Sequence, residues 1–194
     1  ITPKHGGIAL VSQSGAICAA TVEDAMAQGI GFSKVISMGN KVDMDENDIL
    51  ELLSEDDDTR VIVMYLEDIH DGKRFMQIAK KITKEKKKPI VVFKNGRTQR
   101  GAKQAASHTG SLGGSYSVVK GAFDQAGIIS VDSYEELTGS LKALTWQPIP
   151  QGNKVALVTN GAGPIIAAID QFQRLGLKIA ELSEDTKRKF ADHY

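Results

Sequence analysis

The chain has 194 residues, of which 41% are hydrophobic and 25% are charged, a composition typical of folded globular proteins. Its 24 Lys and Arg residues balance its 24 Asp and Glu residues, so no net field would draw it to nucleic acid or to an anionic membrane. No apolar run approaches the roughly 18 residues of a membrane span, no charged-then-apolar leader is present, and the single Cys18 excludes an intramolecular disulfide framework and indicates a reducing, cytoplasmic setting.

Short apolar runs rich in Ile and Val recur along the chain, and most are continuous rather than alternating. Such runs are typical of strands that are buried on both faces of a parallel sheet. The predicted strands are residues 8–12, 34–38, 61–66, 90–94, 128–131, 155–159 and 178–182.

Helical patterns alternate with these strands, which predicts βαβ units with right-handed crossovers. The predicted helices are residues 15–28, 46–54, 72–86, 115–126, 134–144, 163–175 and 184–193. Gly127 and Gly176 stand where a helix is expected to end in a left-handed residue, and Ser133 with Glu136 predicts a capping box. The expected fold is α/β, a parallel sheet with helices on both faces.

A break in the pattern falls at TWQPIPQGN, residues 145–153, where two prolines and a glycine indicate a linker. We therefore expect one complete α/β domain over residues 1–145, a linker over 146–153, and the first part of a second, similar domain over 154–194. Because the chain begins at Ile1 and ends soon after the second domain has begun, we also expect it to be a piece of a longer protein.

Two strand-to-helix corners share one pattern: GIALVSQSGAICAA at residues 7–20 and KVALVTNGAGPIIAA at residues 154–168. A helix start leaves N–H groups unpaired and carries a partial positive charge, and small residues let an anion approach them. The candidate phosphate-binding residues are Ser12, Ser14, Gly15, Ala16, Asn160, Gly161, Ala162 and Gly163. Neither corner matches a phosphate loop ending in GK[ST] or a clean G-x-G-x-x-G, and close packing at the turn is the alternative for each.

The connection NGRTQRGAKQAASHTGSLGGSYS, residues 95–117, is far longer than the 2–6 residues or so that are usual in α/β units, so a functional or a disordered loop is expected. It carries Arg97, Arg100, Lys103 and His108. No metal-ligand spacing surrounds His108, so no metal site is predicted. Phosphoryl chemistry on its imidazole is one reading of this loop, and an ordinary surface histidine is the other.

The segments VSQSGAICAA, MYLEDIHDG, ASHTGSLGG and VTNGAG, in this order, resemble the NDP-forming acyl-CoA synthetases, the superfamily of succinyl-CoA synthetase. With the last segment on the same chain, the closest resemblance is to the α chains of archaeal ADP-forming acetyl-CoA synthetases. The resemblance implies flavodoxin-like domains and a reaction that converts acyl-CoA, phosphate and ADP into acid, CoA and ATP through an acyl phosphate and a phosphohistidine. His108 falls on the phosphorylated histidine, Glu67 on the glutamate that binds its ring, and both corners on the helices that hold the phosphoryl group.

The resemblance also implies parts that lie outside this chain. These are a CoA-binding domain before residue 1 and an ATP-grasp domain or β subunit, which would hold ADP or ATP with Mg²⁺, while acyl-CoA, CoA and phosphate are substrates. The isolated chain is then expected to lack net turnover. A regulatory, acyl-CoA-synthetase-like region of a protein acyltransferase is the alternative, and a flavin-binding module is a third reading that the single Trp146 does not support.

Overall fold

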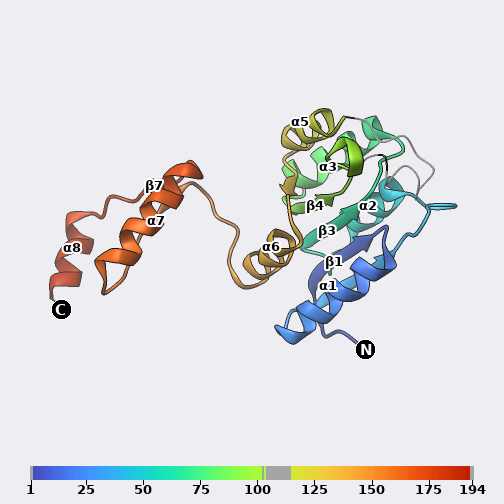
Figure 1. Ribbon diagram of the computed structural model, residues 1–194. Coiled ribbons are helices and arrows are strands. Elements are labelled where there is room, and N and C mark those ends of the chain that lie inside the picture. The colour runs from blue at the N-terminus through green and yellow to red at the C-terminus, as the bar shows by residue number, and fades with distance from the viewer. Residues whose placement is uncertain (1, 102, 104–114, 193–194) are drawn as a thin grey trace. The chain divides into compact units, whose positions relative to one another are not determined.

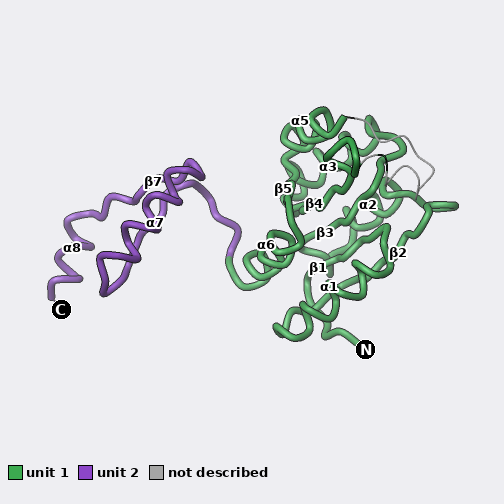
Figure 2. Tube along the Cα trace, viewed as in Figure 1, with its two compact units in different colours: residues 1–147 green, residues 148–194 purple. Residues whose placement is uncertain are grey.

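The computed structural model describes residues 2–101, 103 and 115–192. These residues form two compact units, Ile1–Gln147 and Pro148–Tyr194 (Figure 2). No helix in the described residues is long and apolar enough to cross a membrane.

The first unit contains a five-stranded, all-parallel sheet in the order β2-β1-β3-β4-β5 (Figure 1). Its strands are β1 (His5–Ser12), β2 (Phe32–Ser37), β3 (Val61–Leu66), β4 (Ile90–Lys94) and β5 (Ile129–Val131). This order is that of the flavodoxin-like sheet, in which the chain leaves β1 towards one side for β2 and returns to the other side for β3. The predicted fold class is confirmed.

Helices cover both faces of this sheet: α1 (Gly15–Ala27) and α6 (Tyr134–Trp146) on one face, and α2 (Glu46–Glu55), α3 (Gly72–Lys84) and α5 (Tyr116–Ala126) on the other (Figure 1). Neighbouring residues of one strand enter different cores. In β3, Val63 packs with α1 and α6, whereas Ile62 and Met64 pack with the other three helices. The continuous apolar runs are therefore explained by burial on both faces.

The helix end predicted at Gly127 is present, and the helix start predicted at Ser133 is present with one changed hydrogen bond. Gly127 ends α5 at a φ of 71°, the left-handed conformation that glycine adopts without strain. Ser133 accepts a hydrogen bond from the N–H of Glu136, as predicted, but the Glu136 carboxylate accepts from the N–H of Asp132 rather than from that of Ser133. A reciprocal capping box occurs instead at the start of α2, between Asp45 and Asp48, where sequence analysis did not predict one.

The long connection after β4 differs from the predicted loop, because residues 99–101 are helical. The N–H of Gly101 donates to Thr98 Oγ1 at 3.0 Å, which is the bond that a capping hydroxyl makes at a helix start. His108 and residues 104–114 around it lie outside the described residues.

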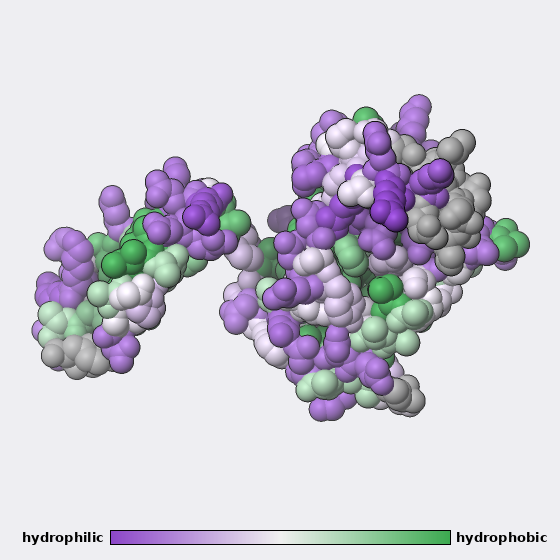
Figure 3. Space-filling model, in the orientation of Figure 1, coloured by the Kyte–Doolittle hydropathy of each residue, from purple (hydrophilic) through white to green (hydrophobic). Residues whose placement is uncertain are grey.

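The second unit contains β6 (Lys154–Val155), α7 (Ala162–Arg174), β7 (Lys178–Ile179) and α8 (Glu184–Ala191). Both strands are shorter than predicted, because each is paired only with the other in a two-stranded parallel sheet. Neither helix has a buried residue, and apolar side chains such as Val158, Ile166 and Leu175 are exposed. Figure 3 shows hydrophobic residues among hydrophilic ones on the surface of this unit.

Candidate phosphoryl-binding site

A cavity of about 660 Å³ opens at the carboxyl ends of β1, β3, β4 and β5. Ligands of open parallel sheets bind at this edge, next to the point where the strand order reverses. The cavity is lined by Ser14, Tyr65, Glu67, Phe93, Asn95, Gly96, Arg97, Thr98, Gly101 and Asp132. It therefore brings together two residues predicted from distant sequence motifs, Ser14 and Glu67.

The first corner is an N-capped helix start. Ser14 is the N-cap of α1, and its hydroxyl accepts a hydrogen bond from the N–H of Ile17 at 3.3 Å. Gly15 and Ala16 are the first residues of the helix, where N–H groups have no intrahelical acceptor. A Cβ added to Gly15 would meet no atom of the described residues within 4 Å, so nothing there packs against the first residue of the helix.

Ser12, a candidate phosphate-binding residue, has its hydroxyl inside the turn. It is fully buried, its hydroxyl donates to the Ser14 carbonyl at 2.7 Å, and it accepts from the Ser14 N–H at 3.1 Å. Because the only hydroxyl proton of Ser12 is used within the turn, this residue shapes the corner rather than offering a donor to a ligand.

Glu67 stands directly after β3 and belongs to a chain of side-chain hydrogen bonds. Its carboxylate accepts from the Tyr65 hydroxyl at 3.2 Å, and that hydroxyl accepts from the Asn95 side-chain amide at 2.6 Å. Burial raises the pKa of Tyr65 to about 12, and the charge of Glu67 acts in the same direction. The phenol is thus a neutral donor throughout the physiological range, which keeps the Glu67 carboxylate in a defined orientation.

Arg97 supplies a fixed cation in the cavity wall. Its guanidinium lies over the rings of Phe93 and Tyr116, at 5.6 and 5.4 Å from their centroids, and forms an ion pair with Asp132 at 2.8 Å. It also donates to the carbonyls of Lys94 and Val131.

Of the basic residues noted in the long connection, Arg97 lines the cavity, whereas Arg100 and Lys103 are exposed.

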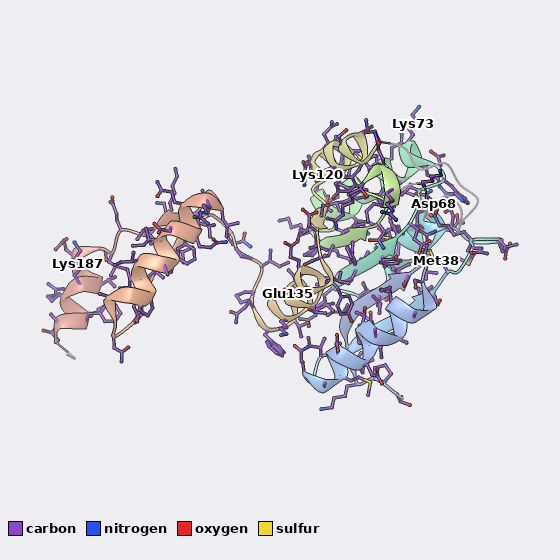
Figure 4. All side chains as sticks on the ribbon, in the orientation of Figure 1. Met38, Asp68, Lys73, Lys120, Glu135 and Lys187 are labelled. Carbon is purple, nitrogen blue, oxygen red and sulfur yellow. The ribbon has the colours of Figure 1, made fainter. Side chains whose placement is uncertain are left out.

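Buried charges lie beside the strand ends, and sequence analysis did not single them out. The Lys41 ammonium lies 2.6 Å from Asp68 Oδ1 and 2.7 Å from Glu46 Oε2, and its side chain is 1% exposed. Asp68 is labelled at this end of the sheet in Figure 4. Burial lowers the pKa of a second lysine, Lys94, while the charge of Asp68 opposes that shift. Asp68 could have been found from its position in the sequence, since polar residues that closely follow buried strands collect at the carboxyl edge of a parallel sheet.

The second corner, in the other unit, is also a strand-to-helix turn. Gly161 is the N-cap of α7, which begins at Ala162 and continues through Gly163, and no side chain caps it. The N–H of Gly161 donates to Thr159 Oγ1 at 3.2 Å, and Asn160 is exposed beside it. Within residues 2–101, 103 and 115–192, no group of three His, Cys, Asp or Glu residues could hold a metal ion.

Comparison with known proteins places the first unit in a family. Residues 5–144 match the model of the succinyl-CoA ligase-like flavodoxin domain. The chain belongs to this family. The resemblance seen in its sequence motifs is thereby confirmed.

Similar full-length proteins are ADP-forming CoA ligases. The chain is 50% identical over 188 residues to a 4-hydroxybutyrate–CoA ligase (ADP-forming) of Nitrosopumilus maritimus, covering 97% of the chain and 27% of that protein. It is 43% identical to the α subunit of an acetate–CoA ligase (ADP-forming) II of Pyrococcus furiosus, covering 94% of the chain and 39% of the subunit. The chain thus spans between about a quarter and two fifths of these relatives.

A solved structure supports the same relationship. The acetyl-coenzyme A synthetase 1 of Ca. Korarchaeum cryptofilum, in complex with phosphate and ADP, matches with a TM-score of 0.85 and 40% sequence identity. The match covers 93% of this chain and 39% of that one.

Proposed function

We propose that this chain is the phosphohistidine-bearing part of an ADP-forming acyl-CoA synthetase. The reaction converts acyl-CoA, phosphate and ADP into the free acid, CoA and ATP. Family membership and the names of the relatives support the reaction class. The observation that carries the proposal is that the N-cap of α1 and the Glu67 carboxylate line one cavity at the carboxyl edge of the sheet.

The chemistry proceeds in three transfers. A phosphate oxygen attacks the thioester carbonyl carbon, and the C–S bond breaks to release CoA as a thiolate and leave an acyl phosphate. A ring nitrogen of His108 then attacks phosphorus, and the P–O bond to the acid breaks as the carboxylate leaves. Finally, a terminal phosphate oxygen of ADP attacks the phosphorus of the phosphohistidine, which regenerates the imidazole and forms ATP.

Each residue of the first corner and Glu67 has a role in this scheme. Glu67 accepts the N–H of one ring nitrogen of His108, which fixes the tautomer and leaves the other nitrogen free to attack. The N–H groups of Gly15 and Ala16, with the Ser14 cap, hold the phosphoryl oxygens at the positive end of α1. Ser12 shapes the turn that presents them.

The second corner carries the same kind of backbone donors, so we propose that Asn160, Gly161, Ala162 and Gly163 also bind a phosphoryl group or phosphate. The nucleotide, with Mg²⁺, would be bound by an ATP-grasp domain or β subunit, and CoA by a CoA-binding domain. The ADP named for one solved relative and the α-subunit name of another support a nucleotide site and a partner subunit. The Mg²⁺ ion and the two kinds of domain follow from the resemblance of the sequence motifs.

The direct test is phosphorylation of the full-length enzyme, with any nucleotide-binding subunit present. Incubation with Mg²⁺ and γ-labelled ATP should give an acid-labile, base-stable label that peptide mapping places on His108. His108→Ala should remove the label entirely. Glu67→Gln should slow labelling by about 10- to 100-fold, because a charged hydrogen-bond partner contributes roughly 1.5–3 kcal/mol.

A folded enzyme that binds ATP but gains no label on His108 would refute the proposal. It would favour a regulatory role in which the corners are ordinary ligand-binding or packing turns. Labelling of His108→Ala at the wild-type rate would move the phosphorylation site elsewhere in the chain.

A further inference from the structure

The main chain of Glu67 is held by two side chains, one from the residue that follows β1 and one from the last residue of β4. On the β1 side, Gln13 Oε1 accepts the N–H of Glu67 at 2.5 Å and the N–H of Asp68 at 3.1 Å, and Gln13 Nε2 donates to Asp68 Oδ1 at 2.6 Å. On the β4 side, the Lys94 ammonium donates to the carbonyls of Glu67 at 2.5 Å and Asn95 at 2.6 Å.

These contacts begin where the backbone ladder stops. The last ladder bonds run from the N–H of Gln13 to the Tyr65 carbonyl and from the N–H of Asn95 to the Leu66 carbonyl. One residue further along, side chains replace the neighbouring strands as partners of the Glu67 main chain. A residue after a strand end is usually free to move as a loop, so this arrangement restricts a position that would otherwise be mobile.

The next residue is anchored as well. The buried Lys41 ammonium binds both the carboxylate and the carbonyl of Asp68, and it also lies 2.7 Å from Glu46. Burying charged groups costs desolvation energy, and a buried ion pair adds little stability compared with apolar residues of the same volume. Core stability therefore gives no reason for this concentration of buried charges at one strand end, whereas a need to fix the backbone does.

We propose that Gln13 and Lys94 are positioning residues of the phosphoryl-transfer site, which hold the Glu67 main chain so that its carboxylate faces the cavity in one orientation. This role rests on the proposed function. Neither side chain lines the cavity, so both act through Glu67 rather than on the substrate. A misplacement of about 1 Å at a reacting group can cost roughly 100-fold in rate.

The chain offers a matched control at the opposite end of β4. Lys88 also donates to main-chain carbonyls, those of Leu53, Ser54 and Asp56 at the end of α2, at 2.8–3.1 Å. Both Lys88→Met and Lys94→Met remove an ammonium that binds main-chain carbonyls. Of these two lysines, only Lys94 contacts Glu67. A loss of phosphoryl transfer in Lys94→Met but not in Lys88→Met therefore separates a positioning role from an effect on stability.

The experiment is single-turnover phosphorylation of the full-length enzyme by γ-labelled ATP, read as a rate constant and an amplitude. Gln13→Met and Lys94→Met should each lower the rate constant by about 10- to 100-fold, with a full amplitude. In steady state, kcat should fall while the KM for nucleotide stays within about twofold. Lys88→Met should keep the wild-type rate constant.

A double-mutant cycle completes the test. If Gln13 acts through Glu67, Gln13→Met should slow a Glu67→Gln enzyme by less than about twofold, because the effects of coupled residues are not additive. Wild-type rate constants in both Met variants, a lowered amplitude alone, or full additivity with Glu67→Gln would overturn the positioning role. If Lys94→Met is too unstable to purify, the rate constant of Gln13→Met alone tests the positioning role.

The two proposals fail differently. A wild-type enzyme that is labelled on His108 while Gln13→Met and Lys94→Met react normally refutes only the positioning role. A wild-type enzyme without label on His108 refutes the proposed function and the positioning role together.

Discussion

Replacement of Lys41 by methionine should strongly destabilise the first unit. The Lys41 side chain is 1% exposed and lies between the carboxylates of Glu46, which is 0% exposed, and Asp68, which is 8% exposed. The Lys41 ammonium lies 2.7 Å from Glu46 Oε2, an oxygen for which the described structure shows no hydrogen bond, so this ion pair is its compensating contact. Lys41→Met would therefore leave two buried carboxylates facing a thioether.

The expected loss is about 3–5 kcal/mol, the usual cost of removing one partner from a buried ion pair. For a domain of this size it corresponds to a fall in Tm of roughly 10 °C. Urea unfolding at pH 7, followed by far-UV circular dichroism, measures the loss directly. The double variant Lys41→Met/Glu46→Gln should recover part of it, because one of the two carboxylates is then replaced by a neutral amide.

Lys34 provides the matched control, since its ammonium pairs with Asp56 at 3.1 Å but the two side chains are 38% and 19% exposed. Lys34→Met should cost no more than about 1 kcal/mol, because solvent screens an exposed pair. Equal losses for Lys34→Met and Lys41→Met would refute the reasoning that burial makes the Lys41 charge indispensable. An unchanged stability of Lys41→Met would do so as well.

Further predictions concern the helix start, an acid and a phenol. Gly15→Ala should leave the free energy of unfolding unchanged or raise it by up to about 1 kcal/mol. It should nevertheless slow labelling of His108, because it adds a methyl group at the helix start that is proposed to hold the phosphoryl oxygens. Gly72→Ala, at the first position of α3, where an added Cβ likewise meets no described atom within 4 Å, should leave labelling unchanged. A hydrogen bond from Thr59, and then one from Lys34, lowers the pKa of Asp56. Its ionised form therefore stabilises the fold above the unfolded pKa of about 4, and the difference in stability between wild type and Asp56→Asn should shrink as pH falls below that value. Equal differences at pH 7 and pH 3 would contradict this. Tyr65→Phe should slow labelling a few-fold, because Glu67 loses a donor. In the wild type, the Tyr65 pKa of about 12 predicts no phenol-dependent break in the labelling rate between pH 7 and 10.

Local sequence was sufficient for the fold class of the first unit and for the positions of its main strands. Its apolar runs are continuous because β3 and its neighbours are covered on both faces, and the bounds Val61–Leu66 and Ile90–Lys94 were predicted without error. Gly127 and Ser133 marked helix ends because the conformations required there depend on one or a few neighbouring residues. Motif order was likewise sufficient for the family.

Local sequence was less informative where pairing decides the outcome. The strands of the second unit were predicted over 155–159 and 178–182 but extend over only two residues each, since each is paired with one neighbour. Helical residues 99–101 were missed because the small and polar residues around them are typical of loops.

The partners of Glu67 were decided by the tertiary structure alone. Gln13 is 54 residues away from Glu67 in sequence and Lys94 is 27 away, and they meet it only because β3 lies between β1 and β4. Strand order is a property of the whole sheet, so a short motif carries no record of which neighbours it will have. The sequence could therefore name Glu67 and His108 as candidates, but the side chains that hold Glu67 in place became visible only once the strands were ordered.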